Sequence, residues 1–258
     1  MAILVLLAGF TAQAVPHPEL LAQIEILSER LRAEPENERL LLQRGDLYRR
    51  HQDYTAAERD LAAARRLTPD APLLDFYEGR LRLDMGDAAD AALLLERYLS
   101  HEPAHAIAWR LRGEALAAAG EYAKAAVSFE SAIRFSAHPG PGLFQWQVLA
   151  LLAARIPGPE VSAVIDAGLE RFGPEVTLLG LGVDLALSEK ETGKAQAYLA
   201  LLPEGLARLP AWRDRIEALG CLKDPAAGGD VCRRSYRSGL DAQLAAFEQS
   251  LQAARKNE

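Results

Sequence analysis

Apolar residues along most of the chain recur at intervals of three and four, which places them on one face of a helix. The stretch 122–135 is an example, because Ala125, Phe129 and Ala132 form one apolar stripe. A second apolar stretch, 107–119, comes just before it, and Gly120 separates the two. The pattern predicts two helices joined by a tight turn.

This helix pair repeats with a period of 34 residues, which indicates a repeat architecture. Five sets of positions keep the step: Gly45, Gly79 and Gly113; Ala57, Ala91 and Ala125; Leu61, Leu95 and Phe129; Pro35, Pro69 and Pro103; and Tyr54, Ala88 and Tyr122. The prolines end each second helix, because proline cannot continue the hydrogen-bond ladder. The predicted units are 38–71, 72–105 and 106–139.

The repeat continues less regularly on both sides of these units. Residues 15–37 are spaced as a lone second helix, which would form an N-terminal cap. Residues 140–203 are predicted to form two degenerate repeats, in which Ala150 and Gly182 echo Gly113.

The remainder, 204–258, is predicted to be a helical C-terminal cap. It has a helix over 206–219, a loop with the two cysteines, and a final helix over 235–256. In that last helix Leu240, Leu244 and Phe247 fall on one side, and Gln243 falls largely on the other.

The 34-residue pattern resembles the tetratricopeptide repeat. The residues that carry the likeness are Trp109, Gly113, Leu116, Gly120, Tyr122, Ala125, Phe129 and Ala132, with their equivalents in the two earlier units. The resemblance implies an all-α solenoid, a right-handed superhelix whose first helices line a concave face that takes an extended peptide or a partner helix. Asp75 and Arg82 depart from the pattern and are expected to weaken the core of the second unit.

On this sequence the resemblance assigns the binding groove to ten positions: Arg39, Leu42, Asp46, Arg49, Leu73, Phe76, Arg80, Ile107, Arg110 and Glu114. Leucine and phenylalanine would supply apolar contacts, and the arginines would bind carboxylates by paired hydrogen bonds. The alternative is that Arg49, Arg80 and Arg110 pair with Asp46, Glu78 and Glu114 of the solenoid itself.

Composition supports this picture and excludes one class of partner. Half of the 258 residues are hydrophobic and a quarter are charged, as in ordinary globular proteins. The formal net charge is −7, and the isoelectric point is about 5.4. Binding of nucleic acid needs clustered lysine and arginine to replace phosphate counterions, so nucleic acid is not expected as a partner.

The N-terminus has the features of a cleavable export signal over residues 1–14. An apolar run from Ile3 to Phe10 precedes Ala12-Gln13-Ala14, which fits the small-residue rule for signal peptidase. The run is too short to span a bilayer, so no stable membrane insertion is expected after cleavage. This predicts a periplasmic or secreted protein; the alternative is an apolar helix that packs onto the fold.

The two cysteines are consistent with export. Cys221 and Cys232 flank one short, turn-rich loop, and a disulfide across it would form in an oxidising compartment. Free buried thiols are the alternative.

The stretch His101-Glu102-Pro103-Ala104-His105 matches the H-E-x-x-H motif of zinc proteases. That motif requires one continuous helix, with both imidazoles on one face. Pro103 aligns with the two earlier helix-ending prolines, so the histidines are expected on different elements. No catalytic residue, metal or cofactor is therefore predicted.

The sequence as a whole predicts a non-enzymatic scaffold of the exported bacterial type, which binds a peptide or helix of an envelope or secreted partner in its concave groove. Two alternatives stay open: a zinc-dependent hydrolase built on the H-E-x-x-H stretch, and a structural spacer with an empty groove.

Overall fold

The computed structural model describes residues 18–223, 240–247 and 249 of the chain. The predicted signal segment 1–14 and Cys232 lie outside the described residues, so signal and disulfide stay predictions. Every regular element in the described part is helical. In chain order the elements are α1 (Pro18–Ala33), α2 (Glu38–Arg50), α3 (Tyr54–Leu67), α4 (Pro72–Asp84), α5 (Ala88–His101), α6 (Ala106–Ala118), α7 (Tyr122–Phe135), α8 (Pro141–Ala153), α9 (Gly158–Phe172), α10 (Val176–Ser188), α11 (Thr192–Ala200), the 3-10 turn η1 (Leu206–Arg208) and α12 (Pro210–Lys223). The predicted all-α repeat class is confirmed.

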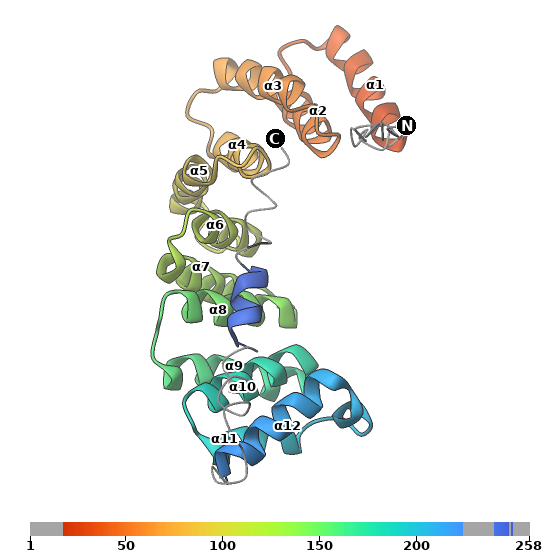
Figure 1. The fold of residues 1–258 in the computed structure, drawn as a ribbon. Coiled ribbons are helices and arrows are strands. Elements are labelled where there is room, and N and C mark those ends of the chain that lie inside the picture. The colour runs from red at the N-terminus through yellow and green to blue at the C-terminus, as the bar shows by residue number, and fades with distance from the viewer. Residues whose placement is uncertain (1–17, 224–239, 248, 250–258) are drawn as a thin grey trace, which may run out of the picture. The chain divides into compact units, whose positions relative to one another are not determined.

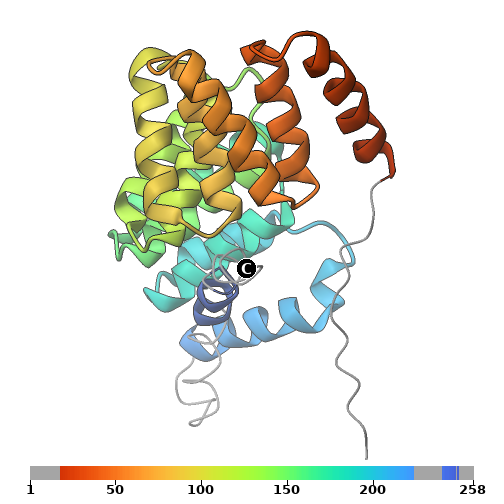
Figure 2. The ribbon, with the colours of Figure 1, turned by 90° about the horizontal axis from the view of Figure 1, so that it is seen from above.

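The chain divides into two compact units, with the boundary after Leu81, inside α4. The first unit holds α1, α2, α3 and most of α4, and the second holds the rest. In the first unit α2 packs against both α1 and α3, and in the second unit each helix from α5 to α11 packs against the helix that follows it. Figure 1 shows α5 to α8 stacked in chain order within the second unit, and Figure 2 shows this unit from above.

Side chains placed just before the helices fix where several of them begin. Asn37 accepts a hydrogen bond from the backbone N–H of Leu40 at 3.2 Å, and Asp53 accepts one from Ala56 at 3.0 Å. These bonds satisfy N–H groups that have no partner within the helix. Gly120, with φ +82°, makes the turn from α6 to α7, in the left-handed region that glycine favours.

The two helices of a repeat meet at a small residue in the first helix and a large residue sixteen positions later. A Cβ atom on Gly113 would lie 2.6 Å from the Phe129 ring, and one on Gly182 would lie 2.9 Å from the Tyr198 ring. Both rings are buried, and both glycines are needed to admit them. The same contact in α6–α7 and in α10–α11 shows that the degenerate region keeps the packing rule of the regular repeats.

Asp75, one of the departures from the repeat pattern, is paired in the first unit. Nη2 of Arg65 in α3 lies 2.7 Å from both Asp75 and Glu78 of α4. These hydrogen bonds raise the already high pKa of the Arg65 guanidinium, the one to Glu78 more than any other cause, although burial opposes the rise. The apolar contact expected at position 75 is therefore replaced by an ion-pair network that links α3 to α4.

The C-terminal part of the second unit differs from the predicted helix over 206–219. A 3-10 turn over 206–208 is followed by extended backbone at Leu209, and α12 begins only at Pro210. A residue before proline is pushed away from helical geometry, which explains the break. Arg215 of α12 holds the buried carboxylate of Asp184 in α10 with two hydrogen bonds of 2.8 and 2.6 Å.

Residues 240–247 are helical and lie against α7, α8 and α10 of the second unit. Phe247 is 4% exposed and belongs to the core cluster formed by α5, α6, α7 and α8. Gln243 donates a hydrogen bond to Asp184, so it shares the packed face with Phe247. The prediction that Gln243 lies opposite is corrected, since residues four apart stand on the same side of a helix.

Candidate binding surface

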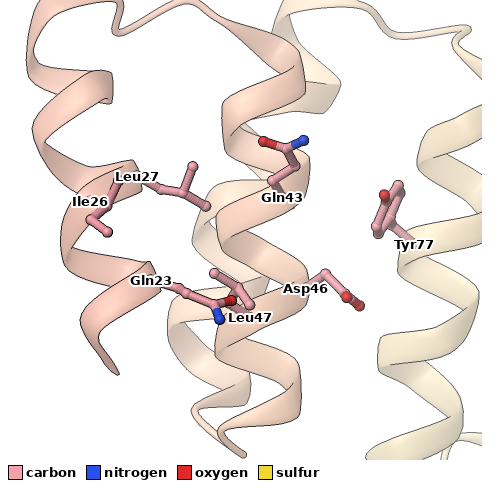
Figure 3. A pocket seen from close by; sticks show the side chains of 7 residues that line it. All are labelled: Gln23, Ile26, Leu27, Gln43, Asp46, Leu47 and Tyr77. Atoms are coloured by element: carbon pink, nitrogen blue, oxygen red, sulfur yellow. The ribbon is translucent and has the colours of Figure 1, made fainter. Parts of the chain in front are cut away.

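A cavity of about 360 Å³ opens between α1, α2 and α4 in the first unit. Seven side chains line it: Gln23, Ile26 and Leu27 from α1, Gln43, Asp46 and Leu47 from α2, and Tyr77 from α4. Figure 3 shows that α1 and α4 present their side chains from opposite sides of α2. The lining mixes aliphatic and aromatic groups with two amides and one carboxylate, as ligand sites usually do.

Helix α1 supplies the apolar wall of this cavity because only part of its surface is buried. Ile24 and Leu31 pack into the unit, at 6% exposure each. Ile26 lies two residues after Ile24, on another side of the helix, and is 61% exposed. An exposed isoleucine beside a cavity offers apolar area to a ligand.

The carboxylate of Asp46 is held by two arginines. Nε of Arg49 lies 3.0 Å from Asp46 Oδ1, and Nη1 of Arg80 in α4 lies 3.0 Å from the same oxygen. The Arg80 guanidinium also lies over the rings of Phe76, at 5.5 Å, and Tyr77, at 6.0 Å. These contacts fix the wall formed by α2 and α4 before any ligand arrives.

The structure places the predicted groove residues of the first unit in different environments. Arg39 and Leu73 are exposed, and Asp46 lines the cavity. Leu42 is 3% exposed and Phe76 is 9% exposed. Their assignment as surface contacts is corrected, because α2 packs against both α1 and α3, and Arg80 covers the Phe76 ring.

The arginines predicted to bind a partner's carboxylates already have carboxylates of this chain beside them. Arg49 pairs with Asp46, and Arg110 in α6 pairs with Glu114 one helical turn later. Arg80 pairs with Asp46, and Glu78 pairs with Arg65. The structure thus has the internal pairing that was the alternative for these side chains.

In the second unit, Ile107 is 54% exposed at the start of α6. Glu114 lies further along the same helix, beside Arg110 and Asp84. Burial raises the pKa of the Glu114 carboxyl, Arg110 opposes this by its charge and hydrogen bond, and Asp84 raises it further. The surroundings of Glu114 therefore disfavour the charged form of its carboxyl group.

The H-E-x-x-H stretch does not form a zinc-protease helix. His101 is the last residue of α5, and His105 is the residue just before α6. Between them Pro103 uses its carbonyl to accept a hydrogen bond from Trp109 Nε1 at 2.8 Å, and the His105 ring packs edge-on against Tyr98. The two imidazoles thus lie at opposite ends of the turn between α5 and α6 and not on one helical face.

Other metal chemistry has no support in the geometry either. Within the part of the chain that the structure describes, no three His, Cys, Asp or Glu side chains gather as a metal site would require. Among the same residues, no helix is both long enough and apolar enough to cross a bilayer.

Sequence reasoning missed most of the cavity. Gln23, Ile26 and Leu27 lie in the segment that the sequence predicts only as an N-terminal cap. Tyr77 directly follows Phe76, the residue that the family resemblance assigns to the groove. A signal was present in α1, where apolar Ile26 and Leu27 lie beside buried Ile24 and give the helix a broader apolar surface than one packed face needs.

The helix pairs and their packing define the class of the molecule as an all-α protein of tandem helix-turn-helix repeats. A sequence profile described as tetratricopeptide repeat matches residues 76–140. A TPR repeat-containing protein of Pseudomonas aeruginosa is 38% identical over 71 residues, which are 28% of this chain and 68% of that protein. The chain belongs to the tetratricopeptide repeat family.

Solved structures share the fold. The C-terminal part of a TPR repeat-containing protein from Cytophaga hutchinsonii has a TM-score of 0.64 and 15% identity, over 92% of this chain and 93% of its own. PilW, described as a widely conserved type IV pilus biogenesis factor, has a TM-score of 0.56 and 18% identity, over 77% of this chain and 91% of its own. At these identities the likeness is one of fold.

Proposed function

We propose that this protein is an exported, non-enzymatic scaffold that binds a peptide or helix of an envelope or secreted partner. The observation that carries the proposal is the cavity between α1, α2 and α4, with its exposed Ile26 and its aromatic wall at Tyr77. Repeat solenoids use surfaces of this kind to hold extended or helical polypeptides.

The chemistry of the cavity favours a partner with one apolar side chain and accessible backbone groups. Ile26, Leu27 and Leu47 offer apolar area, and the amides of Gln23 and Gln43 both donate and accept hydrogen bonds. The Asp46 carboxylate already pairs with Arg49 and Arg80, so a cationic partner gains little there. Because the ion pairs fix α2 and α4, little ordering cost remains for binding.

The proposal of export rests on the sequence of residues 1–14 and on the two cysteines. The described fold also resembles that of PilW, a pilus biogenesis factor, although this likeness concerns the fold alone. Intact-mass measurement of natively produced protein tests the proposal. A chain that starts at Val15 and lacks two hydrogens at Cys221 and Cys232 is expected; a full-length, reduced chain would contradict export.

The binding proposal is tested by site-specific photocrosslinking in the native host. A photoreactive phenylalanine at Tyr77 is expected to crosslink one discrete partner, and Ile26→Asp in the same protein is expected to abolish that product. Ala62→Asp is the matched control, because it adds the same charge at an exposed position of α3 in the same unit. If all three proteins give the same product, or none gives any, the cavity is not the binding site, and the spacer alternative gains support.

A further inference from the structure

The second unit has an internal helix seated on its own surface. Residues 240–247 come from the far end of the chain, yet their aromatic residue is packed among the central repeats. The Phe247 ring lies 5.5 Å from that of Trp146 in α8, at 71°, and 6.3 Å from that of Tyr122 in α7. Figures 1 and 2 show this segment as a short dark blue helix, and α12, which ends at Lys223, in a lighter blue.

The surface that receives the helix has one aromatic position and one polar position. Tyr122 and Trp146 form the aromatic position, and Trp146 also packs against Phe129 of the core at 5.8 Å. Asp184 of α10 forms the polar position and accepts a hydrogen bond from Gln243 Nε2 at 2.5 Å. Gln243 and Phe247 are four residues apart, so one face of a helix reaches both positions.

The Asp184 carboxylate of the receiving surface has a partner other than the segment. Asp184 is 2% exposed, but Arg215 already holds both of its carboxylate oxygens. Loss of Gln243 would therefore leave the Asp184 charge paired. Trp146 stays anchored by Phe129 if Phe247 leaves. The surface is thus formed by the repeats and stays formed when the segment leaves.

The segment itself has few means to hold its helix alone. A helical stretch as short as 240–247 is marginal in water by itself, so its order depends on its contacts with the repeats, including those of Gln243 and Phe247. Its neighbours Asp241 and Ala242 are exposed, as are Ala245 and Ala246. Phe247 is buried, and Leu240, Gln243 and Leu244 are partly buried. A competing helix with the same pattern of side chains can replace these contacts.

We propose that residues 240–247 are an internal competitor on a helix-binding surface formed by Tyr122, Trp146 and Asp184, and that a partner helix displaces them. The partner carries a large aromatic residue four positions after an amide or another hydrogen-bond donor, which reproduces Phe247 and Gln243. This rests on the proposed scaffold function and adds to it a second surface that is closed until a partner arrives. The tether holds the competitor near its site, so a partner must overcome a high effective concentration.

The test uses the full chain and a labelled synthetic peptide with the sequence of residues 235–256. Wild type is expected to bind the peptide at least about tenfold more weakly than the Phe247→Ala variant, because the tethered segment competes only in wild type. The Trp146→Ala/Phe247→Ala variant is expected to lose the tighter peptide binding that Phe247→Ala shows relative to wild type. Gln249→Ala, at an exposed helical position two residues after the segment, is the matched control and should behave as wild type.

Equal affinity for wild type and Phe247→Ala, or no binding to a folded Phe247→Ala variant, overturns the proposal. Circular dichroism establishes that each variant is folded. If Phe247→Ala does not fold, hydrogen exchange on wild type decides. In that case an excess of nitrogen-15-labelled peptide should speed hydrogen exchange at the protein's own backbone amides 240–247. If their protection does not change when the peptide is added, the proposal is overturned.

The experiment is independent of any natural partner and of the cavity in the first unit. Peptide binding without a partner crosslink at Tyr77 would leave this surface standing and remove the proposed site in the first unit. A crosslink at Tyr77 without peptide binding would do the reverse.

Discussion

Gly113 of α6 faces the ring of Phe129 of α7 so closely that a Cβ atom at Gly113 would lie 2.6 Å from Phe129 Cε1. Phe129 has no exposed surface, and its ring also contacts Trp146. The ring has no free space to move into. This one contact sets how closely α6 and α7 approach.

Gly113→Ala is therefore expected to destabilise the second unit by about 1–3 kcal/mol, the usual range for overpacking a core. The loss appears even though alanine favours helices by about 1 kcal/mol over glycine. Gly45→Ala should cost less, because its Cβ would lie 3.4 Å from the flexible end of Leu61. Urea denaturation of the full chain measures both changes.

Gly142→Ala is the control for the change in helix propensity. Gly142 lies in α8, and no atom would lie within 4 Å of its added Cβ. This variant should be as stable as wild type or more so. If Gly113→Ala were equally well tolerated, the packing rule drawn from the Phe129 contact would be wrong.

The ion pair of Arg44 and Asp60 predicts that loss of the arginine alone costs more stability than loss of both partners. Arg44 holds Asp60 through Nε at 2.7 Å and Nη2 at 2.6 Å, and the Asp60 side chain is 8% exposed. Arg44→Met leaves a buried carboxylate without its cation, which should cost about 3–5 kcal/mol. The double variant Arg44→Met/Asp60→Leu should cost less than the single one. A double variant less stable than Arg44→Met, measured by denaturation, would contradict the prediction.

Glu114 predicts how stability changes with pH. Burial raises the pKa of its carboxyl in the folded protein, so the folded state holds the proton more tightly than the unfolded state does. The resulting cost is absent below the unfolded pKa of about 4.3, and it is fully present above the folded pKa. The stability of Glu114→Gln relative to wild type should therefore rise as pH increases from about 4 to about 7.

Denaturation of both proteins across this pH range measures the trend. Glu130→Gln is the control, since Glu130 pairs with Arg134 one turn away, as Glu114 does with Arg110, but is exposed. A stability difference that stays constant with pH, or the same trend in the control, would show that burial of Glu114 is not the cause.

The H-E-x-x-H stretch predicts no stoichiometric zinc. A zinc-protease site needs its two histidines on one helical face, whereas His101 ends α5 and His105 precedes α6. Elemental analysis of protein purified with zinc present should find far less than one ion per chain. His101→Ala/His105→Ala should give the same value, and a stoichiometric signal lost in that variant would restore the hydrolase alternative.

The repeated core could be predicted from the sequence because its rule is local. Gly113 and Phe129 are sixteen positions apart within one helix pair, and the 34-residue period displays the same relation elsewhere. The turn through Pro103 followed from the same alignment, which correctly placed His101 at the end of a helix and His105 in the turn that follows it. The same spacing of sixteen positions also relates Gly182 and Tyr198 in the degenerate region.

The surface residues were less predictable, because exposure depends on which helices lie beside them. Leu42 and Phe76 occupy the right repeat positions for a groove, yet the packing of neighbouring groups buries both. Gln23 and Tyr77 line one cavity although they are far apart in the chain. The position of a residue within its repeat does not predict which residues of other helices lie beside it.

The sequence by itself determined the all-α repeat fold, since apolar periodicity, glycines and prolines act within one helix pair. Only the tertiary structure decided which arginines meet carboxylates, where a cavity opens, and that Phe247 reaches Trp146. These features depend on contacts between elements that no short-range pattern relates. Their burial and pairing arise only when the helices pack.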